Sequence, residues 1–321
     1  MVQDIRAAVA ADFEAVNRYI VEQLHSRVPL VESIGQYIID AGGKRLRPVL
    51  VLLGARCCGH EGDQAVRMAA VIEFIHTATL LHDDVVDMST MRRGRPTANE
   101  QWSNPSSVLV GDFIYSRAFQ ILVGVENPKI MRIIADTTNT IAEGEVLQLL
   151  NKHRVDTSEA DYMQVIEDKT AILFQTAAQC GAIVAEAPEA EEDALKRAGR
   201  HIGLAFQLID DLLDYSGESQ ALGKNIGDDL AEGKPTLPLI HAMHNSSADE
   251  SSLLRSAIEH GGTEHLNEII RIVRQSGSLD YTRQLAGQEV DRALEALSTL
   301  PDNRFRQAME RMARLAVSRD Q

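Results

Sequence analysis

The sequence predicts an all-α protein that folds as one domain of about a dozen helices, several of them long. Apolar residues recur with helical periodicity over long stretches. Strict two-residue alternation over the length of a strand is scarce, and no Asn-Gly or Asp-Gly signal separates β-rich runs. No linker, low-complexity segment or repeat of about 20–50 residues divides the chain, so we expect residues 1–321 to form a single domain.

The first long helix is expected over residues 62–87, GDQAVRMAAVIEFIHTATLLHDDVVD. Its apolar residues face nearly every side, which is typical of a helix in the middle of a bundle. A second helix is predicted over residues 127–152. Asn127 is suited to be its N-cap, and Pro128 suits the first helical position because a missing N–H costs nothing there.

Two more long helices are predicted, over residues 158–187 and 189–217. Ser158 is the expected N-cap of the first, and Gly217 is the expected glycine just past the end of the second. The connections are rich in glycine and proline and comprise residues 41–48, 59–63, 223–238 and 260–262. The last stretch, roughly residues 263–320, is amphipathic and more polar, as expected of helices that cover a central bundle.

Composition excludes several classes of protein. The net charge of −15 argues against non-specific nucleic-acid binding, which needs a basic surface. Three cysteines are too few for a disulfide framework, and the adjacent pair Cys57-Cys58 matches no zinc spacing. No apolar run approaches the ~18 residues that cross a bilayer, and the N-terminus lacks the basic region of a targeting peptide. We expect a soluble cytoplasmic protein without a transmembrane segment.

Two acidic motifs of identical DDxxD spacing carry the first functional signal. Both follow long apolar helical runs, in LLHDDVVD and LIDDLLD. Their members are Asp83, Asp84, Asp87, Asp210, Asp211 and Asp214. Residues four apart share one face of a helix, where like charges cost about 0.2–0.5 kcal/mol. One such motif is most simply a solvated acidic helix end, but two beside basic clusters indicate a cation held between carboxylates.

The chemistry of these residues favours magnesium and phosphate. The ligands offered are all oxygen, which favours Mg²⁺ over zinc, and magnesium often takes further ligands from substrate phosphate. Cationic side chains suited to phosphate form two clusters, Arg92, Arg93 and Arg95, and Lys44, Arg45 and Arg47 in GGKRLRP. That loop lacks the GxxxxGK[ST] pattern, so nucleotide binding is not supported. Two acidic and two basic clusters predict two phosphorylated substrates, one held through magnesium and one mainly by cations.

At these residues the sequence resembles the trans-isoprenyl diphosphate synthases, the polyprenyl synthetase family. The resemblance covers about residues 42–240, from GGKRLRP to GKPTLPLI, and includes HDDVVDMSTMRRGRP and FQLIDDLLDYSG. Details such as IEFIHTATLLHDD and IAEGEVLQL are similar to the long-chain, octaprenyl-type branch. The resemblance implies an all-α bundle around a deep central cavity (the isoprenoid synthase fold), usually a homodimer. It also implies a prenyltransferase that condenses an allylic diphosphate with isopentenyl diphosphate.

The resemblance assigns individual residues. It implies three Mg²⁺ ions on Asp83, Asp87 and Asp210, with Asp84, Asp211 and Asp214 in support directly or through water. It implies isopentenyl diphosphate on Lys44, Arg47, His76 and Arg93. It implies the allylic diphosphate on Arg92, Lys169, Gln207 and Lys224, with Lys234 as a weaker candidate. No protein nucleophile is required, because metals and cations stabilise the charge that develops on the departing diphosphate.

Two of these assignments have plain structural alternatives. Lys169 and Thr170 interrupt an apolar helical stretch, DKTAILF, as a pair facing the cavity would, and a carbonyl or hydroxyl there could steady the allylic cation. Lys169 could equally be an ordinary lysine that extends its amine to solvent. A lone histidine on an apolar helix is usually a core residue, but His76 lies two helical turns before Asp83 on the same face. We interpret His82 as structural.

The expected activity is that of a long-chain all-trans-polyprenyl diphosphate synthase with a product of about C40–C50, for a quinone side chain. Small residues at Ala78 and Thr79, about one turn below Asp83, would let a growing tail pass, and the resemblance points to Leu122 and Ile134 as the floor. A shorter-chain farnesyl or geranylgeranyl diphosphate synthase, a terpene cyclase and a non-catalytic partner subunit are the alternatives. Exact product length, primer, dimer geometry and the release of product, which could involve transient membrane contact, stay open.

Overall fold

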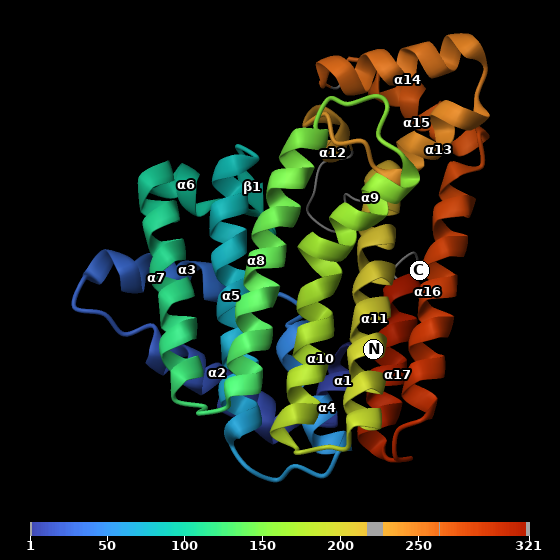
Figure 1. The fold of residues 1–321 in the computed structure, drawn as a ribbon. Helices are drawn as coiled ribbons and strands as arrows, with labels where there is room; N and C mark the ends of the chain where they lie inside the picture. The colour runs from blue at the N-terminus through green and yellow to red at the C-terminus, as the bar shows by residue number, and fades with distance from the viewer. Residues whose placement is uncertain (1, 217–226, 263, 319–321) are drawn as a thin grey trace. The chain divides into compact units, whose positions relative to one another are not determined.

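A computed structural model describes residues 2–216, 227–262 and 264–318, and this part of the chain is almost entirely helical (Figure 1). The prediction of an all-α fold is therefore confirmed. The helices are α1 (Val2–Ala7), α2 (Ala10–Gln23), α3 (Pro29–Asp40), α4 (Leu46–Cys57), α5 (Gln64–Val86), α6 (Ala98–Gln101), α7 (Asn104–Val123), α8 (Pro128–Asn151), α9 (Glu159–Ile166), the π-helical η1 (Glu167–Ala171), α10 (Ile172–Val184), α11 (Glu189–Ser216), α12 (Asp228–Ala231), α13 (Leu237–Asn245), α14 (Ala248–His260), α15 (Leu266–Gln275), α16 (Ser278–Ser298) and α17 (Arg304–Val317).

Several predicted helix starts have the expected caps. The backbone amides of Lys129 and Ile130 donate to Asn127 Oδ1 at 3.0 and 3.1 Å, so Asn127 caps α8. Ser158 forms a reciprocal capping box with Asp161 at the start of α9. Each cap satisfies backbone amides that have no partner inside the helix. Gly217, the predicted glycine after α11, lies outside the described residues.

The predicted helix over residues 158–187 is divided in the structure. It comprises α9, the π-helical segment η1 and α10, so the π-helical turn falls between two α-helical parts. A π-helical turn is a short segment inside an α-helix, so the α-helical patterns on either side of it predicted one continuous helix. Short helices such as α6 and α12, of four residues each, add to the dozen predicted because they are too short for a periodic pattern.

A two-stranded hairpin follows α5 and was not predicted. Strand β1 (Met91–Arg92) pairs antiparallel with β2 (Arg95–Pro96). Arg93 (φ 52°) and Gly94 (φ 74°) form the turn, and both have the positive φ of the tight turns that suit hairpins. Strands of two residues leave no alternation to detect, which is why the sequence pattern missed them. The hairpin turns the chain back after the first aspartate motif.

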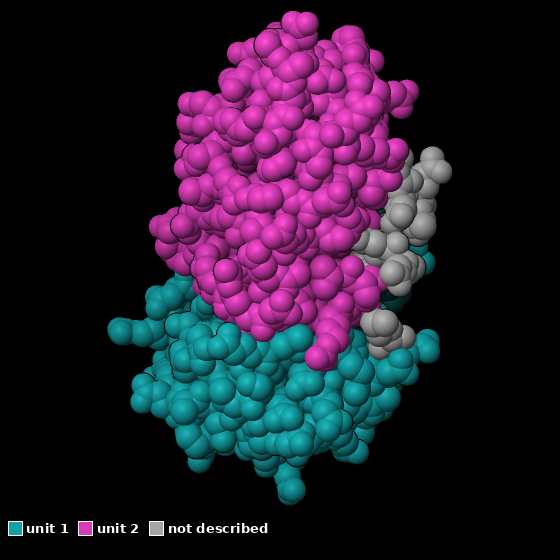
Figure 2. All heavy atoms as spheres, turned by 90° about the vertical axis from the view of Figure 1, so that its right-hand side faces the viewer, with its two compact units in different colours: residues 1–138, 173–199, 294–312 teal, residues 139–172, 200–293, 313–321 magenta. Residues whose placement is uncertain are grey.

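The chain divides into two compact units (Figure 2). Unit 1 comprises residues 1–138, 173–199 and 294–312. Within it, α5 packs against α2, α4 and α7, and its side chains are buried on nearly all sides from Ala65 to Leu81. This confirms the prediction of a helix in the middle of a bundle. Glycines permit close packing of α4 on α10: a Cβ at Gly181 would lie 2.6 Å from the Val51 carbonyl oxygen.

Unit 2 comprises residues 139–172, 200–293 and 313–321. Its apolar core contains buried side chains from α9, α11, α13, α14, α15 and α16. Ile166, Leu212 and Ile240 are among them. The buried polar groups of the second aspartate motif border this core, as described below. Among the residues that the structure describes, no helix has both the length and the apolar character that crossing a bilayer requires.

Candidate active site

The first aspartate motif ends helix α5, in unit 1. Asp83 and Asp84 lie in its last turn and Asp87 is its C-cap, where the Asp87 amide donates to the Asp83 carbonyl at 2.8 Å. The side chains of Asp83 and Asp87 are partly exposed, whereas Asp84 is completely buried. Adjacent carboxylates of one motif therefore have different environments.

Asp84 is held by an arginine of the hairpin. The Arg92 Nε donates to Asp84 Oδ1 and Oδ2 at 2.9 and 3.1 Å, and Nη2 donates to Oδ1 at 2.7 Å. Such forked charge-assisted pairs have a defined orientation. The guanidinium predicted to meet the allylic diphosphate is thus paired with the carboxylate predicted to support the metal.

Two arginines donate to backbone carbonyl groups of the Gly42–Lys44 loop, which precedes α4. Arg6 of α1 donates through Nη2 to the carbonyl oxygens of Gly43 and Lys44 at 2.9 and 2.5 Å. Arg93 donates through Nη1 to the Gly42 carbonyl. Because Arg93 comes from the hairpin, its bond brings the two predicted basic clusters together within unit 1.

Arg45, which the sequence placed in the same basic cluster, faces inward. It has a left-handed backbone (φ 48°) and is the N-cap residue of α4. Its guanidinium pairs with Glu73 of α5 at 3.0 Å, and both side chains are about nine-tenths buried. Burial raises the pKa of Glu73, and the positive charge of Arg45 opposes that rise. Arg45 therefore anchors the loop, while Lys44 and Arg47 on either side remain partly exposed.

His76 of α5 contacts Arg47. Arg47 Nη1 lies 3.3 Å from His76 Nε2, and the guanidinium also lies 4.2 Å above the Phe174 ring. Burial holds the pKa of His76 well below its usual value, and the charge of Arg47 acts in the same direction. A neutral imidazole can accept a hydrogen bond at Nε2 from the Arg47 guanidinium. In that tautomer the proton of the ring is on Nδ1.

The residues predicted to control chain length all lie in unit 1. Ala78 is completely buried in α5, and the Thr79 hydroxyl donates to the His76 carbonyl at 2.8 Å. Leu122 of α7 and Ile134 of α8 are also buried. Within unit 1, Ala78 and Thr79, predicted to let the tail pass, lie on α5, and the predicted floor residues Leu122 and Ile134 lie on α7 and α8.

His82, by contrast, faces α7. Its Nε2 lies 3.1 Å from the Val108 carbonyl oxygen and 3.3 Å from a carboxylate oxygen of Asp112. A Cβ at Gly111 would lie 2.4 Å from the same nitrogen, so the glycine admits the ring. These contacts agree with our interpretation of His82 as structural.

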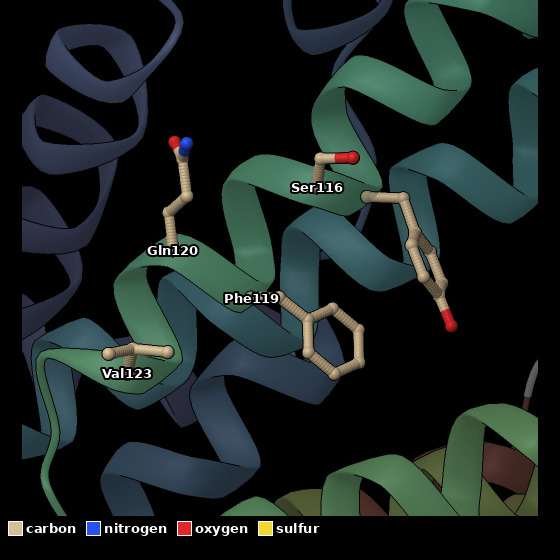
Figure 3. A pocket seen from close by; sticks show the side chains of 5 residues that line it. Ser116, Phe119, Gln120 and Val123 are labelled. Atoms are coloured by element: carbon tan, nitrogen blue, oxygen red, sulfur yellow. The ribbon is translucent and has the colours of Figure 1, made fainter.

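Helix α7 also carries an open groove on its outer face (Figure 3). Tyr115, Ser116, Phe119, Gln120 and Val123 line it. They recur at helical spacing, and the Val123 side chain is 63% exposed. The groove is mainly apolar, and no sequence motif predicted it.

The second aspartate motif lies near the end of α11, in unit 2. Asp210 is partly exposed, whereas Asp211 and Asp214 are buried. The backbone amides of Gly227, Asp228 and Asp229 donate to the Asp214 carboxylate at 3.1 to 3.3 Å. Asp214 therefore holds the first turn of α12.

Asp211 accepts hydrogen bonds on both oxygens. Tyr162 of α9 donates to Oδ2 at 2.6 Å, and Gln207, one turn earlier on α11, donates through Nε2 to Oδ1 at 2.7 Å. Burial, followed by the charge of Asp229, raises the pKa of Asp211, and the bonds from Tyr162 and Gln207 to its carboxylate oppose that rise. The sequence singled out Asp211 and Gln207 but missed Tyr162, which belongs to no motif.

Lys169 and Thr170 lie in the π-helical η1. Lys169 Nζ pairs with Glu145 of α8 at 2.7 Å, and the Thr170 hydroxyl donates to Gln207 Oε1 at 3.0 Å. Gly144 allows this approach, since a Cβ there would lie 2.9 Å from the Lys169 amide nitrogen. The structure thus joins the predicted pair to the predicted glutamine within unit 2.

Of the remaining candidate lysines, Lys234 pairs with Glu232 at 2.6 Å, and Lys224 lies outside the described residues. Within residues 2–216, 227–262 and 264–318, no group of three or more His, Cys, Asp or Glu side chains is arranged to hold a metal ion. The six motif carboxylates nevertheless fall into two kinds. Asp84, Asp211 and Asp214 are buried and bonded to protein donors, and the others are partly exposed.

The chain is similar in sequence to known proteins. A family model described as polyprenyl synthetase matches residues 28–275. The octaprenyl diphosphate synthase of Haemophilus influenzae is 52% identical over 320 residues, which cover 99% of this chain and 97% of that protein.

Two solved structures are also similar. A polyprenyl synthase from Caulobacter crescentus, complexed with calcium and isoprenyl diphosphate, has a TM-score of 0.96 and 43% identity, with coverage of 99% of this chain and 98% of that one. A decaprenyl diphosphate synthase from Rhodobacter capsulatus has a TM-score of 0.95 and 44% identity, with complete coverage of both chains.

Proposed function

Because this chain belongs to the polyprenyl synthetase family and is a long-chain trans-polyprenyl diphosphate synthase, we propose that its two aspartate motifs serve one reaction. In that reaction an allylic diphosphate is condensed with successive isopentenyl diphosphates. The two compact units would together form the single polyprenyl synthetase domain that the sequence predicted. The observation that carries the proposal is the division of both motifs into buried, protein-bonded carboxylates and partly exposed ones.

The partly exposed carboxylates Asp83, Asp87 and Asp210 would hold Mg²⁺, about three ions per site when substrate is bound. Their oxygen donors fit a hard cation that keeps waters and phosphate oxygens as further ligands. The magnesium, when bound, supplies positive charge that stabilises the departing diphosphate. The calcium and isoprenyl diphosphate in the related Caulobacter structure support use of a divalent cation.

The buried carboxylates would act through their partners. Asp84 orients Arg92, Asp211 orients Gln207, and Asp214 holds the turn that begins α12. The buried aspartates would therefore differ in role from Asp83, Asp87 and Asp210, and not all six aspartates would bind metal. The difference follows from burial, because a carboxylate enclosed by protein donors has little space for a hydrated ion.

The diphosphate of isopentenyl diphosphate would be bound by Lys44, Arg47, His76 and Arg93. Their clustering in unit 1 supports this assignment, since Arg93 contacts the Gly42–Lys44 loop and Arg47 contacts His76. A neutral His76 can accept a bond from Arg47 and leave the guanidinium oriented. Cations and polar side chains fixed in this way bind an anion at a lower entropic cost.

The allylic diphosphate would be bound by Arg92, Lys169, Gln207 and Lys224. Thr170 and the adjoining carbonyl groups of η1 would steady the positive charge on the allyl group. The bond from Thr170 to Gln207 supports their action together. Fixed dipoles of this kind are more effective than water because they need not reorganise during the reaction.

We propose a product of about C40–C50, made from a primer such as farnesyl diphosphate, for a quinone side chain. The octaprenyl and decaprenyl names of two relatives support this range. A tail passing Ala78 and Thr79 would end at Leu122 and Ile134. We further propose a cytoplasmic homodimer that pairs through the apolar groove of α7, because exposed apolar stripes favour burial in an interface.

The test is an assay of the purified chain with farnesyl diphosphate, labelled isopentenyl diphosphate and Mg²⁺. We expect products near C40–C50, loss of activity in EDTA and recovery with Mg²⁺. Asp83→Ala and Asp210→Ala should each lower kcat by orders of magnitude because the lost interaction acts mainly in the transition state. Full activity in either variant would contradict the metal assignment.

Two other outcomes would favour the alternatives. Products that stop at about C15–C20 would indicate a shorter-chain synthase. No product from the pure chain, with activity restored by a second subunit, would indicate a partner-dependent enzyme. Sedimentation of the wild type and Val123→Asp would test the dimer, since a charge in the α7 groove should weaken pairing.

A further inference from the structure

Tyr162 lies outside every motif in the sequence, yet its hydroxyl contacts the second aspartate motif. It donates to Asp211 Oδ2 at 2.6 Å, and both side chains are only 4% exposed. Burial and the nearby Asp211 keep the pKa of Tyr162 well above its usual value, so the hydroxyl remains a donor. The ring itself belongs to the apolar core of unit 2. The tyrosine thus connects the core to the candidate site.

The bond determines where Asp211 points. Its other oxygen, Oδ1, accepts from Gln207 Nε2 at 2.7 Å. An oxygen that accepts selects the amino end of the Gln207 carboxamide, so the carbonyl end must face the other way. There Gln207 Oε1 accepts from the Thr170 hydroxyl at 3.0 Å. Four side chains, Tyr162, Asp211, Gln207 and Thr170, form one continuous chain of hydrogen bonds.

The chain ends at an unusual backbone. Thr170 belongs to η1, the π-helical turn that connects the α-helices α9 and α10. Tyr162 lies on α9 and Gln207 on α11, so the hydrogen bonds join three elements. π-helical turns are often found at functional sites. The far end of this chain of hydrogen bonds is therefore at the π-helical turn that carries Lys169 and Thr170.

We propose that Tyr162 is a positioning residue for prenyl transfer. Through Asp211 it fixes the carboxamide of Gln207 with Oε1 toward Thr170, so the amide cannot reverse. Without the hydroxyl, the Asp211 carboxylate loses one of its two donors and can rotate, and Gln207 then has two orientations. The inference rests on the proposed function of Gln207 and Thr170. Tyr162 itself is buried in the core of unit 2 and is not among the residues assigned to substrate or metal.

The test compares Tyr162→Phe, Gln207→Ala and the double variant in the full-length enzyme with Mg²⁺. The matched control is Tyr281→Phe, which also removes a tyrosine-to-carboxylate bond in unit 2, from Tyr281 to Glu159. We expect Tyr162→Phe to lower kcat about tenfold, with the KM for isopentenyl diphosphate changed less than about twofold. Tyr281→Phe should leave both constants within about twofold.

Non-additivity identifies the route of the effect. If Tyr162 acts through Gln207, Tyr162→Phe should cause no further loss of kcat in the Gln207→Ala background. Melting temperatures are measured for all four variants, and kcat is taken per folded enzyme below the onset of unfolding. A structural effect alone would lower the melting temperature and leave that kcat unchanged, which would overturn the inference.

The remaining outcomes separate the two proposals. Normal kcat in Gln207→Ala would contradict the proposed function of Gln207. A damaged Gln207→Ala together with a fully active Tyr162→Phe would overturn only the positioning by Tyr162. Multiplicative losses in the double variant would do the same, because they would show that the two residues act independently.

Discussion

Asp84 and Arg92 form an ion pair in which the carboxylate is completely buried and Arg92 Nη2 lies 2.7 Å from Asp84 Oδ1. The pair joins the end of α5 to the hairpin strand β1. Asp83, the adjacent residue, is partly exposed. Two neighbouring aspartates of one motif therefore offer different chemistry, and this difference can be measured.

We expect Asp84→Asn to impair binding of the allylic diphosphate and leave the magnesium requirement unchanged. Asparagine keeps the shape but withdraws the charge that orients Arg92, so KM for the allylic substrate should rise roughly tenfold. Loss of the charged bond should lower the free energy of unfolding by about 1–3 kcal/mol. Asp83→Asn is the control, because it should raise the Mg²⁺ concentration for half-maximal rate. Equal Mg²⁺ shifts in both variants would show that Asp84 is itself a ligand.

His76 should make the protein sensitive to acid. Its pKa is lowered by burial and by Arg47 in the folded state, whereas the unfolded residue titrates near about pH 6.5. Below that pH the unfolded chain binds the extra proton, so the stability that neutral His76 contributes is complete above about pH 6.5 and falls below it. His76→Gln retains an acceptor for Arg47 but does not titrate. Urea midpoints should therefore fall less between about pH 6.5 and 5 than in the wild type; parallel profiles would contradict this.

Gly144 should be required for the position of η1. A Cβ there would lie 2.9 Å from both Asp168 Cβ and the Lys169 amide nitrogen, closer than packed atoms normally approach. We expect Gly144→Ala to destabilise the protein by about 1–3 kcal/mol and to lower kcat by displacing Lys169 and Thr170. Denaturation and steady-state kinetics check both effects.

The control for this substitution is Gly287→Ala in α16. Among the described residues, no atom beyond the adjoining backbone of α16 lies within 4 Å of a Cβ at Gly287, so alanine should stabilise that helix by about 0.5–1 kcal/mol and leave activity intact. If Gly144→Ala behaved like Gly287→Ala, the close approach of α8 and η1 would be unimportant.

Ala78→Tyr should shorten the product. Ala78 is completely buried, so the ring must enter any passage beside α5 or displace its neighbours. A blocked tail leaves diphosphate chemistry intact and yields shorter chains, whereas a packing clash costs about 1–3 kcal/mol without a clean change of length. Product analysis by mass spectrometry distinguishes a blocked tail from a packing clash. Ala55→Tyr, at a buried position on α4, is the overpacking control.

Leu122→Ala should have the opposite effect on the product. Leu122 is almost completely buried in α7, so its truncation should cost about 2–5 kcal/mol of stability and open space at the proposed floor. The assay is run below the onset of unfolding. An unchanged product distribution in both Ala78→Tyr and Leu122→Ala, with folding intact, would refute this account of length control.

The sequence by itself determined the all-α class, the long helices and the places of both motifs. Helical periodicity, N-caps such as Asn127 and Ser158, and the DDxxD spacing all depend on residues a few positions apart. Interactions of such short range can be predicted from the local sequence pattern. The family membership follows from the same motifs in the same order.

Only the tertiary structure decided which member of each motif is buried and what it contacts. Asp83 and Asp84 are neighbours with the same side chain, and no local pattern shows that the second is completely buried and accepts hydrogen bonds from Arg92. Arg6 holds carbonyl groups 37 and 38 positions away, and Tyr162 meets Asp211 across 49 positions. Contacts over such separations depend on how helices pack, and packing is set by the whole core at once. The local pattern therefore identified the charged groups, and the packing of the helices determined how they are oriented.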